Sequence, residues 1–367
     1  MILRLDLYIL VVSILFCYPV VSFNGPKMAF FARVQHRVSA LSMVDTANVM
    51  IYNSLSRSKE LFVPQQAPRV SFYSCGPTVY DYAHIGNFRA FLTYDLLKRW
   101  LVYCGYKVEH VCNLTDIDDK ILIKMAKEGK TLEEVTNHFA DAFFEDLGVL
   151  NIIKADAYPR ATEHIRDIEA MICKLVDKGF AYESKGSVYF RVGEFAEYGE
   201  LANRDFSKDE VGTGGYGPNA RRGIADKENS RDFVMWKKCS EDEPMGYDSQ
   251  WGRGRPGWHI ECSAMIEKIL GETIDVHAGG VDLVFPHHQN EIAQSECCTG
   301  KPLCKYWVHN GFVNINSEKM SKSLKNFKTL RDIASTPADA RAFRLLVVSA
   351  QYRGALNFTP ETLRAAQ

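Results

Sequence analysis

The segment that most constrains the fold runs from Phe72 to Ala90 and joins an expected strand to an expected helix. Apolar residues that lead into Gly76-Pro77 predict a buried strand followed by a tight turn. Apolar residues then recur at a helical period from Phe88 to Trp100. The tetrapeptide His84-Ile85-Gly86-Asn87 lies where this helix should begin. Because a helix N-terminus presents unpaired N–H groups and the positive end of a dipole, the tetrapeptide predicts a phosphate-binding site.

Three residues of this tetrapeptide have separate expected roles. His84 and Asn87 can donate hydrogen bonds to phosphate oxygens, and Gly86 has no side chain to keep a ligand from the backbone. Alone the pattern is weak, because a histidine at a helix start is more often a cap or a surface residue. The next expected strand, Lys107 to Leu114, completes a strand–helix–strand order. That order predicts a parallel sheet whose ligands bind at the carboxyl ends of the strands, where Thr115 follows.

A second candidate phosphate-binding segment is Lys319-Met320-Ser321-Lys322-Ser323, late in the chain. It follows a strand-like run from Tyr306 to Ile315 and a polar turn. Two lysines and two hydroxyls on a loop suit the charge of a departing pyrophosphate. A solvated basic loop is the more usual interpretation of such a run.

Together and in this order, the two segments resemble the HIGH and KMSKS signatures of class I aminoacyl-tRNA synthetases. Four more blocks narrow the resemblance to the cysteinyl-tRNA synthetases, namely residues 75–81, 113–120, 257–265 and 285–291. The resemblance extends from about Ile51 to the C-terminus. It implies an α/β fold: a parallel-sheet, Rossmann-like class I synthetase catalytic domain with a connective insertion and a C-terminal helical stem-contact segment. Asn87 departs from the first signature, which often has a second histidine there, but ATP binding should survive because asparagine also donates.

The resemblance implies that both signatures bind ATP, through His84, Gly86, Asn87, Lys319, Ser321 and Lys322. Four of these residues would bind the phosphates during catalysis: His84, Asn87, Lys319 and Lys322. Lys322 would be the main cation for the departing pyrophosphate. Mg²⁺ is expected to arrive with ATP, and no protein ligand for it is evident.

A metal site is indicated less directly. His287 and Glu291 lie at i and i+4 of an expected helix, which is ligand geometry, although such a pair is more often an ordinary surface hydrogen bond. Spacing alone does not pair Cys75 with Cys262, and each would be interpreted as a core cysteine. The resemblance implies that these four residues bind zinc. Zinc takes thiolate, imidazole and carboxylate ligands, and its open position would bind the thiol of a cysteine substrate as thiolate.

The resemblance also implies substrate-binding residues around the zinc, at Gly76, Thr115, Trp258, His277 and Asp282. Trp258 would form a wall of the pocket, although a core aromatic is the plainer interpretation, and Asp282 would pair with the substrate ammonium. A serine hydroxyl would not ionise comparably, so selection of cysteine would need no editing domain. His288 is expected to point away from the ligand face, as a structural histidine.

The predicted regions are a targeting leader (1–50), the first half of the catalytic domain (51–160), the insertion (161–253), the second half with the zinc ligands (254–300) and the stem-contact region (301–367). Residues 193 to 257 lack regular periodicity and predict an irregular excursion. The family continues into a helical anticodon-binding domain, which is not expected within these 367 residues.

The leader combines two targeting patterns. Tyr8 to Phe16 is an apolar run behind Arg4, and residues 24–44 hold lysine and arginine but no acidic residue. This order resembles the two-part leader of proteins sent to plastids of secondary origin, with a mitochondrion as another destination. A translation start at Met28 or Met43 would instead give a cytoplasmic protein. No membrane partner is expected for the mature form.

Composition limits the partners. A net charge of −1 gives no global basic field, so RNA would have to bind a local patch. Ten cysteines without close CxxC pairs in so large a chain do not predict a disulfide framework. The oligomeric state is not determined by the sequence, and a monomer is compatible with it.

The expected function is that of a cysteine–tRNA ligase with ATP, L-cysteine and tRNA(Cys) as partners. One alternative is an ATP-dependent ligase that joins cysteine to the amine of an amino-sugar in thiol biosynthesis. Another is a non-catalytic zinc-binding module derived from a synthetase. The intact segment from Lys319 to Ser323 argues against that module, which would not need to handle pyrophosphate.

Overall fold

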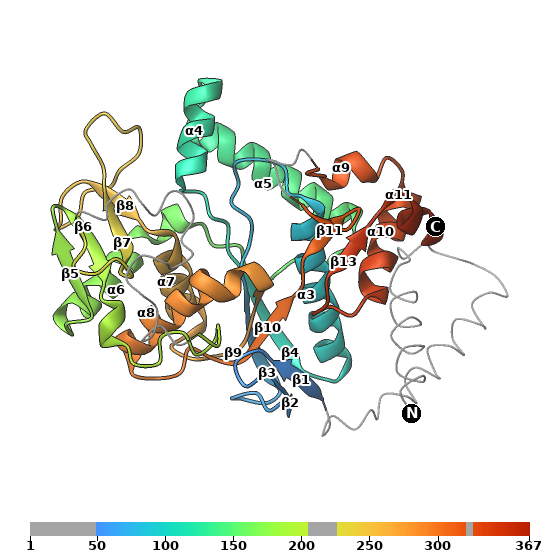
Figure 1. Cartoon of the computed structure of the whole chain (residues 1–367), viewed down its shortest axis with the longest axis horizontal. Helices are drawn as coiled ribbons and strands as arrows, with labels where there is room; N and C mark the ends of the chain where they lie inside the picture. Colours follow the sequence, from blue (N-terminus) through green and yellow to red (C-terminus); the bar gives the residue numbers. More distant parts are fainter. Residues whose placement is uncertain (1–48, 205–225, 321–325) are drawn as a thin grey trace.

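A computed structural model describes residues 49–204, 226–320 and 326–367 (Figure 1). The predicted leader lies almost entirely outside these ranges, as do Ser321 and Lys322 of the second signature segment. Within the described ranges, no helix has both the length and the apolar character that a membrane crossing requires.

The centre of the molecule is a four-stranded parallel sheet in the order β10-β9-β3-β4. Its strands are β3 (Arg69–Ser74), β4 (Lys107–Cys112), β9 (Ile274–Gly280) and β10 (Cys304–Asn310). Helix α3 (Ile85–Tyr103) connects β3 to β4, which confirms the predicted strand–helix–strand unit. The α/β class with a parallel sheet is therefore confirmed. All four strands end at one edge, where ligands bind in sheets of this kind.

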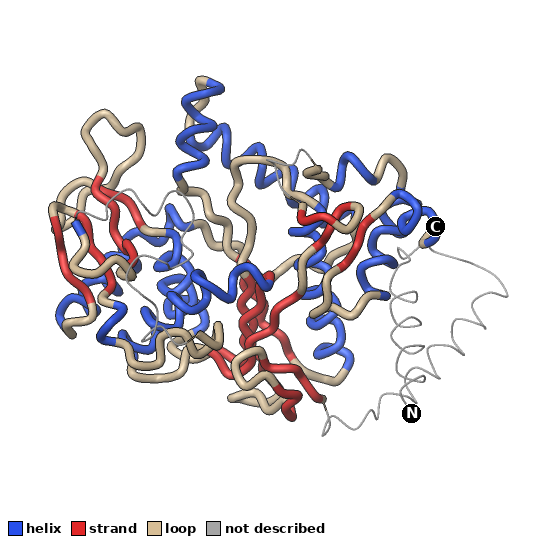
Figure 2. The backbone as a smooth tube through the Cα atoms, in the orientation of Figure 1, coloured by secondary structure: helices blue, strands red, loops and turns tan. Residues whose placement is uncertain are grey.

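Helices cover both faces of this sheet (Figure 2). Successive strand residues point to opposite faces, so Phe72 packs in the core with α3 and α5 (Leu132–Val149) while Tyr73 packs with α7 (Trp258–Leu270). The remaining long helices are α4 (Asp119–Glu128), α6 (Ile165–Asp177), α8 (Gln289–Thr299) and α10 (Pro337–Ser349). A capping box begins α5, because Thr131 and Glu134 each accept the other's backbone N–H.

The predicted insertion, together with the three residues that follow it, contains a second sheet, at the left of Figure 1. The sheet begins with the hairpin of β5 (Ala181–Ser184) and β6 (Ser187–Phe190). β7 (Phe233–Lys238) and β8 (Gly254–Pro256) extend it into four antiparallel strands. The prediction that residues 193–257 are irregular throughout was therefore wrong. β7 has four consecutive apolar residues followed by two lysines, and β8 has three residues, so neither carries a period-two signal, and both depend on pairing with distant strands.

Three short strands near the C-terminus form a third sheet in the order β12-β11-β13. They are β11 (Val313–Ile315), β12 (Glu318–Lys319) and β13 (Leu356–Phe358), with helices α9 (Leu330–Ile333) and α11 (Pro360–Ala365) nearby. The strand-like run predicted from Tyr306 to Ile315 is confirmed, but it is divided into β10 of the central sheet and β11 of the third sheet. The break falls at Gly311, where a Cβ would lie 2.3 Å from the carbonyl oxygen of Gly354.

The other described elements are small. An antiparallel pair, β1 (Met50–Asn53) and β2 (Ser58–Leu61), lies beside the central sheet. Short 3-10 turns span Ala161–His164, Val192–Glu194 and Val281–Leu283, and a π-helical turn spans Val284–His288.

Candidate active site and metal centre

The four predicted metal ligands come from three parts of the chain and meet at the carboxyl edge of the central sheet. Cys75 directly follows β3, Cys262 lies in α7, and His287 and Glu291 flank the start of α8. Their ligand atoms lie within 4.8 Å of one another, and all four residues are buried. Folding therefore gathers a donor set that spacing in the sequence could not pair.

The distances within this set suit a zinc ion. The Sγ of Cys262 lies 3.5 Å from Nε2 of His287, and the Sγ of Cys75 lies 3.9 Å from Oε1 of Glu291. His287 Nε2 is 2.9 Å from the same Oε1. Bonds of about 2.0–2.3 Å to a tetrahedral zinc place its ligands roughly 3.3–3.8 Å apart. Two thiols, an imidazole and a carboxylate thus fit zinc in type, and the three separations of 2.9, 3.5 and 3.9 Å bracket the spacing that zinc requires.

The charges in this cluster also favour a cation. A hydrogen bond from Cys75 is the main cause that lowers the pKa of Cys262 to about 6, which makes it a thiolate at neutral pH. Burial opposes ionisation of Glu291, but His277 and His287 outweigh it and lower the pKa of Glu291 to about 2. Burial likewise opposes protonation of His287, yet Glu291 and Cys262 raise its pKa to about 10. A proton on His287 thus partly balances two anions that a metal ion would balance directly.

Behind the ligand His287 lies His259, which the sequence reasoning missed. Nδ1 of His259 is 2.8 Å from Nδ1 of His287, whose Nε2 faces the cluster. A neutral ligand imidazole that presents Nε2 carries its proton on Nδ1 and donates it to His259. His259 therefore fixes the tautomer and the ring orientation of His287. His259 directly follows Trp258 in the sequence, and nothing in that position indicates a contact with His287.

His288 lies beside the cluster, so the prediction that it points away from the ligand face was wrong. Its Nε2 is 3.3 Å from Sγ of Cys75, and its Nδ1 is 2.8 Å from Nε2 of His309. The reason is the π-helical turn before α8, which contains the non-helical Phe285, so α-helical face assignments fail there. A second group of buried donor residues results: Cys75, His277, His288 and Glu291.

Two predicted substrate-binding residues touch the metal ligands. The indole of Trp258 stacks on His287 with ring centroids 4.1 Å apart, and 39% of the residue is exposed. A ring with one face on a ligand and another side open suits the wall of a pocket. His277 Nε2 lies 2.6 Å from Oε2 of Glu291, and its ring stacks on Trp307. His277 lies inside β9, which continues to Gly280.

The other three predicted substrate-binding residues lie at the same edge of the sheet. The N–H of Gly76 donates to Oδ1 of Asn113 at 3.0 Å, and Nδ2 of Asn113 donates to Oγ1 of Thr115 at 3.2 Å. Asp282 is exposed in the turn that follows β9. Asn113 thus connects the ends of β3 and β4 and fixes Gly76 relative to Thr115.

The two signature segments also meet. His84 and Asn87 form a reciprocal capping box at the start of α3, in which Nδ1 of His84 accepts the N–H of Asn87 at 3.0 Å. A neutral His84 ring therefore carries its proton on Nε2. The Cε of Met320 would lie 3.1 Å from a Cβ added to Gly86, and Ile85 donates to the carbonyl oxygen of Lys328 at 3.0 Å. Of the predicted ATP-binding residues, the structure places His84, Gly86, Asn87 and Lys319, whereas Ser321 and Lys322 lie outside the described residues.

Residues 61–367 match the family model described as tRNA synthetases class I (C) catalytic domain. The chain belongs to this family. A cysteine–tRNA ligase of Trichodesmium erythraeum (strain IMS101) is 50% identical over 317 residues, which are 86% of this chain and 65% of that protein. A cysteine–tRNA ligase of Geobacillus sp. (strain WCH70) is 50% identical over 323 residues, 88% of this chain and 67% of that protein. The chain thus spans about two thirds of the length of these relatives.

Solved structures agree on the architecture of this class I (C) synthetase family member. Mycobacterium tuberculosis methionyl-tRNA synthetase in complex with methionyl-adenylate superimposes with a TM-score of 0.61 at 14% identity, covering 81% of this chain and 67% of that chain. A putative arginyl-tRNA synthetase from Campylobacter jejuni gives a TM-score of 0.52 at 13% identity, covering 90% and 70% of the two chains. At such low identity, the likeness shows the fold alone.

For this family member, the contact between His259 and His287 gives a testable result. His259→Ala should weaken zinc binding by roughly 10–100-fold, because a ligand that loses its outer hydrogen-bond partner is less basic and less well oriented. Competition with a chromogenic chelator measures the affinity. His164→Ala, in a histidine that pairs with Asp167 and belongs to neither group of donor residues, is the matched control and should leave the affinity unchanged. Equal affinities in both variants would contradict the role assigned to His259.

Proposed function

We propose that this chain activates L-cysteine with ATP and transfers the cysteinyl group to the terminal adenosine of tRNA(Cys), as a cysteine–tRNA ligase. One observation carries the proposal: two thiols, an imidazole and a carboxylate form a buried cluster at the carboxyl edge of the central sheet. The two signature segments meet at the same edge. Relatives of about 50% identity bear the name of that activity.

In the first step, the carboxylate of cysteine attacks the α-phosphate of Mg·ATP in line, and pyrophosphate leaves. Such a transfer depends on positioning and on charge stabilisation. His84 and Asn87 would bind phosphate oxygens at the start of α3, where the helix dipole assists them. Lys319 and Lys322 would neutralise the pyrophosphate as it departs. We assign no general base.

Selection of cysteine would occur at the metal centre. Zinc held by Cys75, Cys262, His287 and Glu291 would stabilise the substrate thiol as thiolate, a bond that a serine hydroxyl does not match. The side chains around it would orient the rest of the amino acid. Trp258 would pack against the substrate, and the carboxylate of Asp282 would pair with the ammonium group.

Gly76 and Thr115 would bind the adenylate, and His277 would act on the substrate indirectly, through the proposed ligand Glu291. Gly76 and Thr115 would hold the adenylate at the ends of β3 and β4, where Asn113 joins them. His277 would keep Glu291 oriented toward the metal through the 2.6 Å contact. In the second step, the adenylate passes its cysteinyl group to a hydroxyl of the tRNA's terminal adenosine, and AMP leaves.

Cysteine-dependent exchange of pyrophosphate into ATP tests the proposal, because this step needs no acceptor. We expect the full chain with zinc to catalyse exchange with cysteine and not with serine. A folded, zinc-loaded chain without exchange would refute the activating function and leave a zinc-binding module. Aminoacylation of tRNA(Cys) then tests the acceptor, and transfer to an amino-sugar instead would overturn that half of the proposal.

A further inference from the structure

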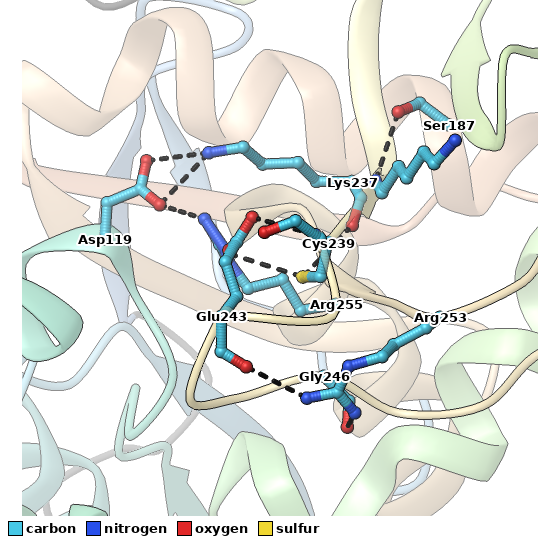
Figure 3. A network of polar contacts seen from close by, with 10 residues as sticks. Asp119, Ser187, Lys237, Cys239, Glu243, Gly246, Arg253 and Arg255 are labelled. Atoms are coloured by element: carbon cyan, nitrogen blue, oxygen red, sulfur yellow. Dashed lines mark hydrogen bonds and ion pairs between the residues drawn. The ribbon is translucent and has the colours of Figure 1, made fainter.

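The insertion sheet is joined to the catalytic domain by a group of charges that the steps above do not use (Figure 3). Asp119, the first residue of α4, contacts Lys237 of β7 and Arg255 of β8. Nζ of Lys237 lies 3.1 and 3.0 Å from the two carboxylate oxygens of Asp119, and Nη2 of Arg255 donates to Oδ1 of the same carboxylate. We call Asp119, Lys237 and Arg255 the Asp119 clamp.

Arg255 is the buried member of the Asp119 clamp. Only 5% of its side chain is exposed. Its Nη1 donates to Oε2 of Glu243 at 2.7 Å and lies 3.6 Å from Sγ of Cys239. One guanidinium therefore bridges a carboxylate of the insertion and a carboxylate of the catalytic domain. Because a buried cation is costly unless its hydrogen bonds are satisfied, Arg255 is held in place by both partners.

The strand register explains why a carboxylate is needed at this position. Lys237 and Arg255 lie directly opposite each other in the antiparallel pair β7–β8, so two cations extend from one face of the sheet. Like charges at opposite positions repel, and Asp119 offsets that repulsion by contacting both. Burial alone would raise the pKa of Asp119, but the hydrogen bonds and charges of Lys237 and Arg255 lower it, which keeps the carboxylate ionised.

Asp119 and Arg255 each lie close in the sequence to one wall of the proposed amino-acid site. Thr115 precedes Asp119 by four residues, and Trp258 follows Arg255 by three. Trp258 packs on the ligand His287, and Thr115 is joined to Gly76 through Asn113. A chain spans at most about 3.5 Å per residue, so connections this short transmit a displacement of the clamp to the walls.

We propose that Asp119 and Arg255 are positioning residues that set the separation between the Thr115 wall and the Trp258 wall of the amino-acid site. The proposal rests on the proposed function for the identity of the amino acid, whereas the link between the two walls depends on the contacts alone. When the clamp is weakened, β8 and the first turn of α7 move relative to the segment after β4. The amino acid then loses contacts on one side, while the phosphate-binding start of α3 is unaffected.

Exchange kinetics of Asp119→Asn test this role. The substitution keeps the shape of the side chain and removes its charge. We expect the KM for cysteine to rise about tenfold, corresponding to about 1.4 kcal/mol. The KM for ATP should stay within about twofold, because α3 is not displaced. Arg255→Lys should behave similarly, because an ammonium group cannot bridge Asp119 and Glu243 as a planar guanidinium does.

A second substitution separates positioning from general damage. Lys237→Gln added to Asp119→Asn removes the uncompensated charge beside Arg255, so it should recover part of the lost affinity for cysteine. Lys238→Gln in the same background is the matched control and should recover none, because neighbouring residues of a strand point to opposite faces. A normal KM for cysteine in Asp119→Asn, or an equal recovery with either lysine variant, would overturn the proposal.

Amide hydrogen exchange distinguishes failure of the clamp from failure of the proposed function. In Asp119→Asn, residues 113–119 and the first turn of α7 should exchange faster than in the wild type, and Lys237→Gln should slow them again. If the wild-type chain failed to catalyse pyrophosphate exchange while the variants still showed these changes in amide hydrogen exchange, the result would refute the proposed function and support the clamp. Unchanged protection in the variant would reject the clamp whatever the activity of the wild type.

Discussion

Cys262→Ala should lose its bound zinc and, with it, most cysteine-dependent exchange of pyrophosphate into ATP. Cys262 is 1% exposed, and its low pKa makes it the cluster's thiolate at neutral pH. Loss of an outer partner of a metal ligand costs roughly 10–100-fold in affinity or activity, so loss of a ligand should cost more than about a hundredfold. Elemental analysis of the purified protein and exchange kinetics measure the two effects.

A cysteine elsewhere in the core provides the control for Cys262→Ala. Cys104 is 2% exposed at the end of α3 and packs among apolar residues. Cys104→Ala removes the same sulfur atom from a comparable environment and should leave zinc content and exchange unchanged. Full metal occupancy in Cys262→Ala would remove this residue from the ligand set. Residual exchange in that variant should also discriminate less between cysteine and serine, because the soft thiolate contact is lost.

The parts of the fold that could be predicted from the sequence are those with local causes. The β3–α3–β4 unit follows from apolar periodicity and turn residues, and the start of α5 follows from its own capping box. Strands β7, β8 and β13 carry no such signal, because β8 and β13 have three residues each and β7 lacks apolar–polar alternation. All three are stabilised by partners far away in the chain. Regular hydrogen bonding between remote segments cannot be recognised from the composition of either segment.

The residues of the candidate site also divide into those that local spacing predicts and those that depend on distant contacts. His287 and Glu291 could be placed on one helical face by spacing, whereas Cys75 and Cys262 entered the ligand set only through the family resemblance. His259 and His309 could not be identified, because their roles depend on contacts that exist only after the sheet and α8 are assembled. His288 was misplaced because a π-helical turn replaces the α-helical geometry on which the prediction depended. Outer contacts of a metal centre are thus the part least visible in a sequence.

A pair of glycine substitutions should shift stability in opposite directions. Gly148 lies exposed in α5 with no atom within 4 Å of an added Cβ, so Gly148→Ala should stabilise the chain by about 0.5 kcal/mol through helix propensity. At Gly76, an added Cβ would lie 1.6 Å from the carbonyl oxygen of Asn113. That contact is with backbone, which cannot rotate away, so the ends of β3 and β4 must separate. Gly76→Ala should therefore destabilise the chain by about 3 kcal/mol.

Gly76→Ala should affect the candidate site as well as the stability of the chain, because of where Gly76 lies. It follows the proposed metal ligand Cys75, and its N–H donates to Asn113, which in turn donates to Thr115. Separation of the two strand ends should displace the Sγ of Cys75 and break this connection, so zinc content and exchange activity should fall together with the melting temperature. Thermal denaturation and elemental analysis of both alanine variants check the pair. Because the chemical change is identical, a shift of the same sign at both glycines would show that the approach of Asn113 to Gly76 is not what holds this edge of the site.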